Sequence, residues 1–166
     1  NNMYAVQYDS PVGRLLLTCR DEGLTGIWFD RELPDHCRQE KHPILHRTQL
    51  WLDSYFSGEK PSMEISLAPE GTEFQKQVWK RLLTIAYGET KTYGEIAREV
   101  ASVMGKEKMS AQAVGQAVGK NPISILIPCH RVVGSKGQLT GYAGGLEKKI
   151  WLLRHEGQQG IKELEK

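Results

Sequence analysis

The spacing of apolar residues changes in kind at a proline-containing segment, 59–71, and this change limits the folds open to the chain. Before this segment, short apolar runs separated by turn residues are typical of antiparallel strands. After it, apolar residues recur every three or four positions, which is typical of helices. The sequence therefore predicts an α+β protein, with a small N-terminal antiparallel β lobe and one helix over 1–58, a linker over 59–71 and a mostly helical domain over 72–166.

Three strands and a helix are expected in the N-terminal lobe. Turn residues separate three short runs of apolar and β-branched residues, at 4–8, 14–18 and 24–29. After a polar stretch, apolar residues recur at helical spacing from Leu45 to Phe56, and Gly58 ends the run. The lobe is therefore predicted to be a β-meander followed by a helix.

Capping residues mark the helix starts of the C-terminal domain. The capping-box pattern, a threonine with Glu or Gln three positions later, occurs at Thr72 and at Thr92, and Ser110 can cap a third helix over 111–118. The last two helices resemble a helix-turn-helix, although their connection over 102–109 is longer than the usual turn. Helix pairs with no nucleic-acid role show the same pattern.

The charge is unevenly distributed, although the net charge is only +2. Residues 1–70 carry 7 basic and 11 acidic side chains, whereas residues 71–166 carry 15 basic and 9 acidic ones. Between Lys108 and Leu146 there is no Asp or Glu. Such a region favours a polyanionic partner, because contacts between cations and phosphates release counterions. Chance clustering on a solvated face gives the same pattern.

The composition excludes several classes of protein. The chain has 3 cysteines, too few and odd in number for a disulfide scaffold, which favours a reducing compartment. No apolar run approaches the ~18 residues of a membrane helix. The first residues show no signal-peptide pattern. We therefore expect a soluble, cytoplasmic protein.

One cysteine has neighbours that favour reactivity. The apolar segment 123–127 leads into Pro128, and Cys129 follows directly, with His130 and Arg131 after it. A thiol reacts as the thiolate, and a neighbouring His or Arg lowers the thiol pKa. The alternative is an inert buried cysteine, the commonest state of a lone Cys. A core cysteine, however, has no reason to lie between Pro and a polar pair.

The adjacency of Cys129 and His130 limits the mechanism. Because consecutive side chains diverge, we expect a bridging water to carry a proton between the sulfur and the ring. The imidazole then needs an acceptor at its other nitrogen, and Glu156, at the end of a helix that starts near Leu146, is a candidate. Alternatively, Glu156 is a surface acid that balances Arg154.

The turn sequence Pro-Cys-His-Arg-Val at 128–132 resembles the active-site signature of the O6-alkylguanine-DNA alkyltransferases. Proteins of that family repair alkylated DNA by moving the alkyl group onto their own cysteine. Further segments resemble the family in order and spacing: 92–97, 119–133, 140–145 and 151–157. The resemblance is strong over 72–157 and looser over 9–29.

The resemblance implies a role for each catalytic residue. Cys129 would be the alkyl acceptor, activated through water by His130. Glu156 would orient the His130 ring. Asn121 would hydrogen-bond the backbone of the active-site turn, and Tyr93 would donate a hydrogen bond to the departing guanine.

The resemblance also implies a pocket for the guanine base. Its walls would be the backbone around Cys129, Val132 and Ala143, together with Tyr142 and the glycines that follow, Gly144 among them. Glycine suits a wall that a base approaches closely. Because a base inside a duplex cannot reach such a pocket, the nucleotide would have to be flipped out.

The helix over 111–118 is rich in small residues, which suits close approach to the minor groove and gives little sequence specificity. Many relatives have an Arg in this helix that takes the place of the flipped base, and Gln112 stands at that position here. Gln112 could fill the gap without the charge of Arg, or it could be a plain polar surface residue. The expected DNA contacts are Ala111, Gln112, Ala113, Gly115, Lys120 and Arg131.

The expected function is that of a suicide enzyme, a methylated-DNA-[protein]-cysteine S-methyltransferase. An alkyl group on O6 of guanine, or on O4 of thymine, in double-stranded DNA would move to Cys129 once per molecule, in a monomer without a cofactor. Two alternatives stay open: a non-catalytic helix-turn-helix damage sensor or regulator, and a cysteine hydrolase with a Cys-His-Glu triad. Sensors of this family replace the cysteine by Trp, and a hydrolase needs direct contact between the Cys and the His.

No metal site is predicted. Some relatives bind zinc in the N-terminal lobe through Cys and His, and this chain offers five such residues there: Cys19, His36, Cys37, His42 and His46. Their spacing matches no common zinc pattern, and the cysteines do not align with those of the zinc-binding members.

Overall fold

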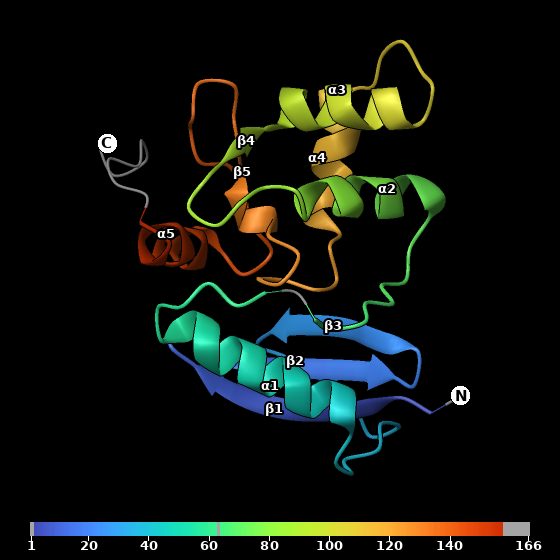
Figure 1. The fold of residues 1–166 in the computed structure, drawn as a ribbon, viewed down its shortest axis with the longest axis vertical. Helices are drawn as coiled ribbons and strands as arrows, with labels where there is room; N and C mark the ends of the chain where they lie inside the picture. Colours follow the sequence, from blue (N-terminus) through green and yellow to red (C-terminus); the bar gives the residue numbers. More distant parts are fainter. Residues whose placement is uncertain (1, 63, 158–166) are drawn as a thin grey trace. The chain divides into compact units, whose positions relative to one another are not determined.

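The computed structural model describes residues 2–62 and 64–157, and it divides the chain into two units (Figure 1). The first unit comprises residues up to Glu70 together with Pro122–Ser124. The second comprises Gly71–Asn121 and the chain from Ile125 onward. Strands fill the first unit and helices dominate the second, which confirms the α+β class and the order of the two lobes.

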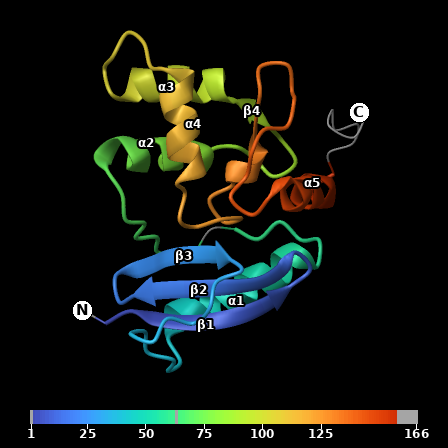
Figure 2. The ribbon, with the colours of Figure 1, turned by 180° about the vertical axis from the view of Figure 1, so that it is seen from behind.

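An antiparallel sheet and one helix form the first unit. The sheet has the order β1-β2-β3, from strands β1 (Tyr4–Ser10), β2 (Gly13–Arg20) and β3 (Gly23–Phe29). Helix α1 (Pro43–Phe56) lies across one face of this sheet (Figures 1 and 2). The three predicted strands and the helix are therefore present, and each strand is longer than its apolar run.

The middle strand is buried on both faces of the sheet. Since successive side chains point to opposite faces, the buried run Leu15–Cys19 must be covered on both sides. On one side Leu16 packs with Ala5 and Cys37, with Leu33 against the cluster. Leu33 and Cys37, from the polar stretch after β3, therefore cover the face of the sheet on which the Leu16 side chain lies.

Two segments distant in sequence add to the edge strand β3. Leu24 N donates to Ser66 O at 2.8 Å, and Ala68 N donates to Leu24 O at 2.8 Å. Further along β3, Ile27 N donates to Pro122 O at 2.9 Å. Residues 59–70 of the expected linker 59–71 thus contribute to the first unit, and they satisfy edge groups that would otherwise be open to another strand.

Three helices pack together in the second unit: α2 (Glu73–Leu82), α3 (Tyr93–Val103) and α4 (Ala111–Gly119). Both predicted capping boxes are present, at Thr72 and Thr92, and Ser110 caps α4. Trp79 of α2 is buried and donates from Nε1 to Ala117 O at 2.8 Å, which fixes α4 against α2. Helices α3 and α4 are the predicted pair.

Short elements complete the second unit. A 3₁₀ turn, η1 (Cys129–Arg131), leads into β5 (Val132–Val133), which pairs in parallel with β4 (Lys91–Thr92). Helix α5 (Leu146–His155) follows a loop and contacts η1. The pairing of β4 with β5 places the start of α3 beside the residues that follow Cys129. Over the described residues no helix is long and apolar enough to cross a membrane.

The cap of α3 provides a test of this fold. Thr92→Ala removes the acceptor for Glu95 N (3.1 Å) and should lower the free energy of unfolding by about 1 kcal/mol. The exposed Thr90→Ala, just before the helix, should change it by less than about 0.5 kcal/mol. Urea unfolding followed by circular dichroism measures both, and equal losses would contradict the capping role.

Candidate active site around Cys129

A strained turn holds Cys129 in the interior of the second unit. All residues from 121 to 133 are buried, and Cys129 is 4% exposed. Ile125 has a φ of 70°, a left-handed conformation that is rare for a β-branched residue and persists only where the surroundings enforce it. Asn121 Nδ2 donates to Ile127 O at 2.9 Å. The apolar segment that leads to Cys129 is therefore itself part of a fixed turn.

Burial makes the Cys129 thiol a weaker acid than an ordinary cysteine. Desolvation raises the pKa of Cys129 above its ordinary value and outweighs Asn121, Lys149 and Tyr142, which lower it. This corrects the sequence-based expectation of a lowered thiol pKa: burial prevails, and the guanidinium of Arg131 and Nε2 of His130 are engaged with Glu156. At neutral pH the thiol is protonated, so its reaction needs a base.

His130 has one nitrogen engaged and one available. Its Nε2 lies 2.7 Å from Oε2 of Glu156, and both side chains are fully buried. Burial lowers the pKa of His130 and prevails over Glu156, which raises it, so we assign a neutral ring that donates from Nε2. Nδ1 is buried and has no hydrogen-bond partner among the residues that the structure describes. Nδ1 is therefore the nitrogen that can accept a proton.

Arg131 is part of this buried cluster. Its Nε and Nη2 donate to the two carboxylate oxygens of Glu156 at 2.7 and 2.9 Å, and Nη1 donates to Ile85 O at 2.7 Å. We call His130, Arg131 and Glu156 the Glu156 network. Arg131 is 8% exposed, which corrects its expected place among the DNA contacts, because its donors are already used inside the protein.

The network keeps Glu156 ionised. Burial alone would raise the pKa of Glu156, but His130 and Arg131 hold it well below its usual range. Glu156 also receives a weaker hydrogen bond from Gly88 N at 3.3 Å. It is thus a buried carboxylate, and the alternative of a surface acid balancing Arg154 is wrong.

Two polar residues near the cysteine were not singled out from the sequence. Lys149 is fully buried and donates from Nζ to Val132 O at 2.7 Å and to Thr140 O at 3.4 Å. The Thr140 hydroxyl lies 2.6 Å from the Tyr93 hydroxyl. A signal for Lys149 did exist, because it shares the apolar face of its helix with Leu152 and Leu153.

The expected pocket residues differ in depth. Val132 is fully buried, whereas Tyr142 and Gly144 are half-buried and Ala143 is exposed. The Tyr142 side chain lowers the pKa of the Cys129 thiol, and its ring meets that of His130 edge-on at 6.4 Å between centroids. These residues thus extend from the thiol to the surface.

The exposed face of α4 carries small and amide side chains. Ala111, Gln112 and the following Lys120 are exposed, while Ala113 and Gly115 are half-buried. A Cβ on Gly115 would lie 3.7 Å from the Tyr93 ring, so this side of α4 packs close to Tyr93. Gln116 is also exposed and, four residues after Gln112, shares its face. Gln116 was not among the residues expected at the DNA surface.

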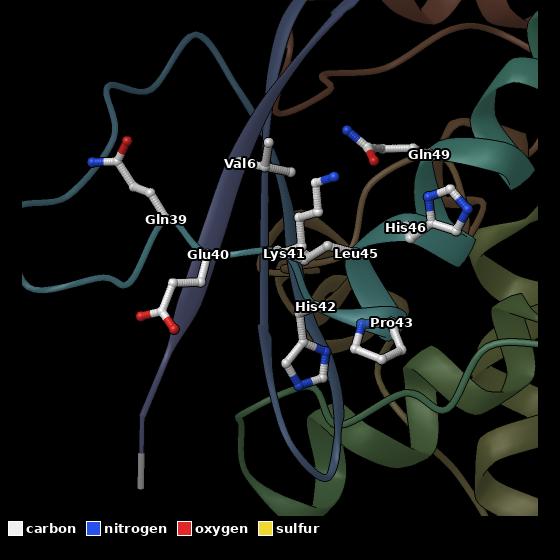
Figure 3. Close-up of a pocket in the computed structure, with 9 residues that line it drawn as sticks. All are labelled: Val6, Gln39, Glu40, Lys41, His42, Pro43, Leu45, His46 and Gln49. Atoms are coloured by element: carbon white, nitrogen blue, oxygen red, sulfur yellow. The ribbon is translucent and has the colours of Figure 1, made fainter.

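A hollow of about 750 Å³ lies in the first unit (Figure 3). His42 and His46 both line it, but Nδ1 of His42 accepts from Ile44 N at 3.1 Å and Nε2 lies 3.0 Å from Asp21. Both ring nitrogens of His42 are therefore occupied. Over residues 2–62 and 64–157 no group of three or more His, Cys, Asp or Glu could hold a metal ion.

Two family profiles match the chain. Residues 3–69 match a profile described as 6-O-methylguanine DNA methyltransferase, ribonuclease-like domain. Residues 73–158 match one described as 6-O-methylguanine DNA methyltransferase, DNA binding domain. The two matches cover both units of the structure.

Curated relatives and solved structures agree with these profiles. A Methanosarcina acetivorans methylated-DNA–protein-cysteine methyltransferase is 47% identical over 160 residues, which cover 93% of this chain and 99% of the relative. A Haemophilus influenzae protein of the same name is 43% identical over 159 residues, covering 93% of this chain and 86% of the relative. The crystal structure of Mycobacterium tuberculosis O6-methylguanine methyltransferase is 38% identical, covers 98% of each chain and has a TM-score of 0.80. The M. tuberculosis protein OGT in complex with DNA also matches with a TM-score of 0.80 and 38% identity, covering 99% of this chain and 98% of that one. The chain therefore belongs to the O6-methylguanine-DNA methyltransferase family.

Proposed function

We propose that the protein repairs double-stranded DNA by moving an alkyl group from O6 of guanine, and from O4 of thymine, to the sulfur of Cys129. Relatives at 47% and 43% identity are named methylated-DNA–protein-cysteine methyltransferase. The observation that carries the proposal is the buried thiol of Cys129 next to the Glu156 network. This is a nucleophile, a base and the carboxylate that orients the base.

Proton removal is the first step of the proposed mechanism. The thiol is protonated at neutral pH, and His130 Nδ1 is the available acceptor. The proton passes through one bridging water, because the two side chains diverge. Glu156 offsets the charge that the imidazole gains, since its carboxylate oxygen already lies 2.7 Å from Nε2.

Alkyl transfer follows as a displacement at carbon. A lone pair of Sγ of Cys129 forms the new S–C bond while the bond between O6 and that carbon breaks, and the electron pair stays on the guanine. A hydrogen bond from Tyr93 to the base offsets this negative charge. The buried ammonium of Lys149 favours the thiolate form of Cys129, the form that attacks.

The product explains why the protein would act once. A thioether has no carbonyl for water to attack and no good leaving group, unlike an acyl-enzyme. A cysteine hydrolase with the same triad residues would also need direct contact between Cys and His, whereas His130 Nδ1 has no hydrogen-bond partner within the described chain. The geometry thus favours stoichiometric transfer over turnover.

The DNA surface proposed for this activity is the exposed face of α4, entering the minor groove. Its small residues allow a close backbone approach and offer few groups that read bases, which supports low sequence specificity. Base flipping would bring the damaged nucleotide to the half-buried Tyr142 and Gly144. Gln112 or Gln116 would fill the gap left in the stack.

We further propose that the protein works as a monomer in the cytoplasm. Its three cysteines are buried and unpaired, which fits a reducing compartment. All groups of the proposed mechanism come from one chain. The rival function, a non-catalytic damage sensor, makes no use of Cys129 or of the base and carboxylate beside it.

Cys129→Ser tests the acceptor directly. A hydroxyl is a far weaker nucleophile, so O6-methylguanine in a duplex should persist, while DNA affinity stays within about twofold because phosphate contacts lie elsewhere. Chromatography of the digested DNA and fluorescence anisotropy measure the two quantities. Cys37→Ala, at a buried cysteine of the first unit, should keep repair. Repair by Cys129→Ser would refute the acceptor assignment.

The placement of Arg131 predicts a change in pH dependence. The charge of Arg131 lowers the pKa of His130, so Arg131→Met raises that pKa. Because the base must be neutral, the rate falls as pH falls through this pKa, and the acid limb of the pH–rate profile should move to higher pH. Arg131→Met also leaves the buried Glu156 carboxylate with too few partners, which should lower the free energy of unfolding by about 3–5 kcal/mol. Arg131→Lys keeps the positive charge, so it should fold and show a smaller shift of the acid limb.

DNA affinity separates this role from a phosphate contact. Arg131→Lys should bind a methylated duplex as tightly as the wild type, whereas the exposed Lys120→Ala should reduce the salt slope of binding by about 1 and leave the pH profile alone. Salt titrations by anisotropy measure both. An unshifted profile in both Arg131 variants would contradict the buried role.

Gln112→Ala tests base flipping. It should slow repair of a duplex by about tenfold or more and leave the reaction with free O6-benzylguanine unchanged, because only the duplex requires an extruded base. Gln112→Arg should match or exceed the wild type on duplex DNA. Gln116→Ala, on the same face, shows whether Gln112 or Gln116 fills the gap that the flipped base leaves in the stack. Equal slowing of Gln112→Ala on both substrates would make Gln112 a pocket or folding residue.

A further inference from the structure

The Tyr93 hydroxyl touches a second hydroxyl that the proposed mechanism does not use. Oγ1 of Thr140 lies 2.6 Å from it, in the loop between β5 and α5. Both residues are half-buried. Either oxygen can donate across this bond, and each hydroxyl has only one proton to give. The direction of this one hydrogen bond therefore decides whether the Tyr93 proton is free.

We propose that Thr140 is a positioning residue for alkyl transfer: its hydroxyl donates to the Tyr93 oxygen and so directs the Tyr93 proton to the departing base. This inference rests on the function proposed above and adds a residue to it. If Tyr93 donated to Thr140 instead, its proton would be used within the protein. With a base present as acceptor, donation by Thr140 lets both hydrogen bonds form.

A hydrogen bond to its backbone carbonyl holds Thr140 in place. Its carbonyl oxygen accepts from Lys149 Nζ at 3.4 Å, and the same ammonium donates to Val132 O at 2.7 Å. Lys149 is fully buried in α5, so the amine joins the Thr140 loop to β5. A β-branched side chain also has few χ1 rotamers. The hydroxyl therefore stays within reach of Tyr93.

The Tyr93 ring is confined as well. Tyr93 is the first residue of α3, after the capped Thr92, and a Cβ at Gly115 would lie 3.7 Å from its ring. Burial raises the pKa of Tyr93, and the hydrogen bond with Thr140 lowers it. A hydroxyl that accepts one hydrogen bond donates a stronger one. Thr140 thereby makes Tyr93 a better donor to the leaving guanine.

Single-turnover rates on methylated duplex DNA test the inference. Thr140→Val keeps the shape but removes the hydroxyl, and it should slow methyl transfer by about 3- to 10-fold, the effect of one hydrogen bond. Thr140→Ser should restore most of the rate. The exposed Thr90→Val is the matched control and should react like the wild type. DNA affinity should be the same in all four proteins.

Two further measurements separate this role from a structural one. In a Tyr93→Phe background, Thr140→Val should cause no further loss, because the group through which it acts is gone. Methylation of Cys129 by methyl iodide should proceed at the wild-type rate in Thr140→Val, because iodide leaves without a proton. Peptide mass mapping locates the methyl group.

The outcomes are distinct. A wild-type rate for Thr140→Val on DNA, or an equal loss in the Tyr93→Phe background or with methyl iodide, would overturn the positioning role while leaving the proposed function intact. A wild-type protein that transfers no methyl group from DNA would overturn the function itself.

Discussion

The buried carboxylate of Glu156 is the group on which the rest of the site depends. It accepts from His130 at 2.7 Å and from Arg131 at 2.7 and 2.9 Å, inside the protein. A buried charge is tolerated only when it is paired and hydrogen-bonded, and the bidentate Arg131 satisfies that condition. Because Arg131 balances the charge, Glu156 orients His130 without forcing a proton onto it. The same contacts fasten the turn that carries Cys129 to the end of α5.

A thiol whose pKa is raised by burial suits a protein that uses its nucleophile once. Such a cysteine stays mostly protonated at neutral pH, which slows its reaction with other electrophiles. In the proposed mechanism, reactivity then depends on His130 as base, on Lys149, whose charge favours the thiolate, and on Tyr93 with Thr140, which stabilise the leaving base. Cys129 is thus activated by the groups around the sulfur and not by a lowered thiol pKa.

Local signals in the sequence predicted much of this molecule. Capping boxes at Thr72 and Thr92 depend on residues three apart, and the Cys129 turn with His130 is contiguous, so both were visible without a structure. Contacts between distant segments were not: Thr140 meets Tyr93 across 47 positions, and Arg131 reaches Ile85 across 46. Arg131 was expected among the DNA contacts, and its burial was not visible because its partners Glu156 and Ile85 are distant in sequence. The raised thiol pKa was missed because burial of residues 121–133 outweighs sequence neighbours.

Intact-protein mass spectrometry with excess methylated duplex DNA tests the central claim most directly. The account predicts that the protein mass rises by one methyl group and stops there, that the loss of O6-methylguanine reaches one equivalent per chain, and that fragmentation places the methyl group on Cys129. Continued loss of O6-methylguanine beyond one equivalent, or a methyl group on Cys19 or Cys37, would contradict it.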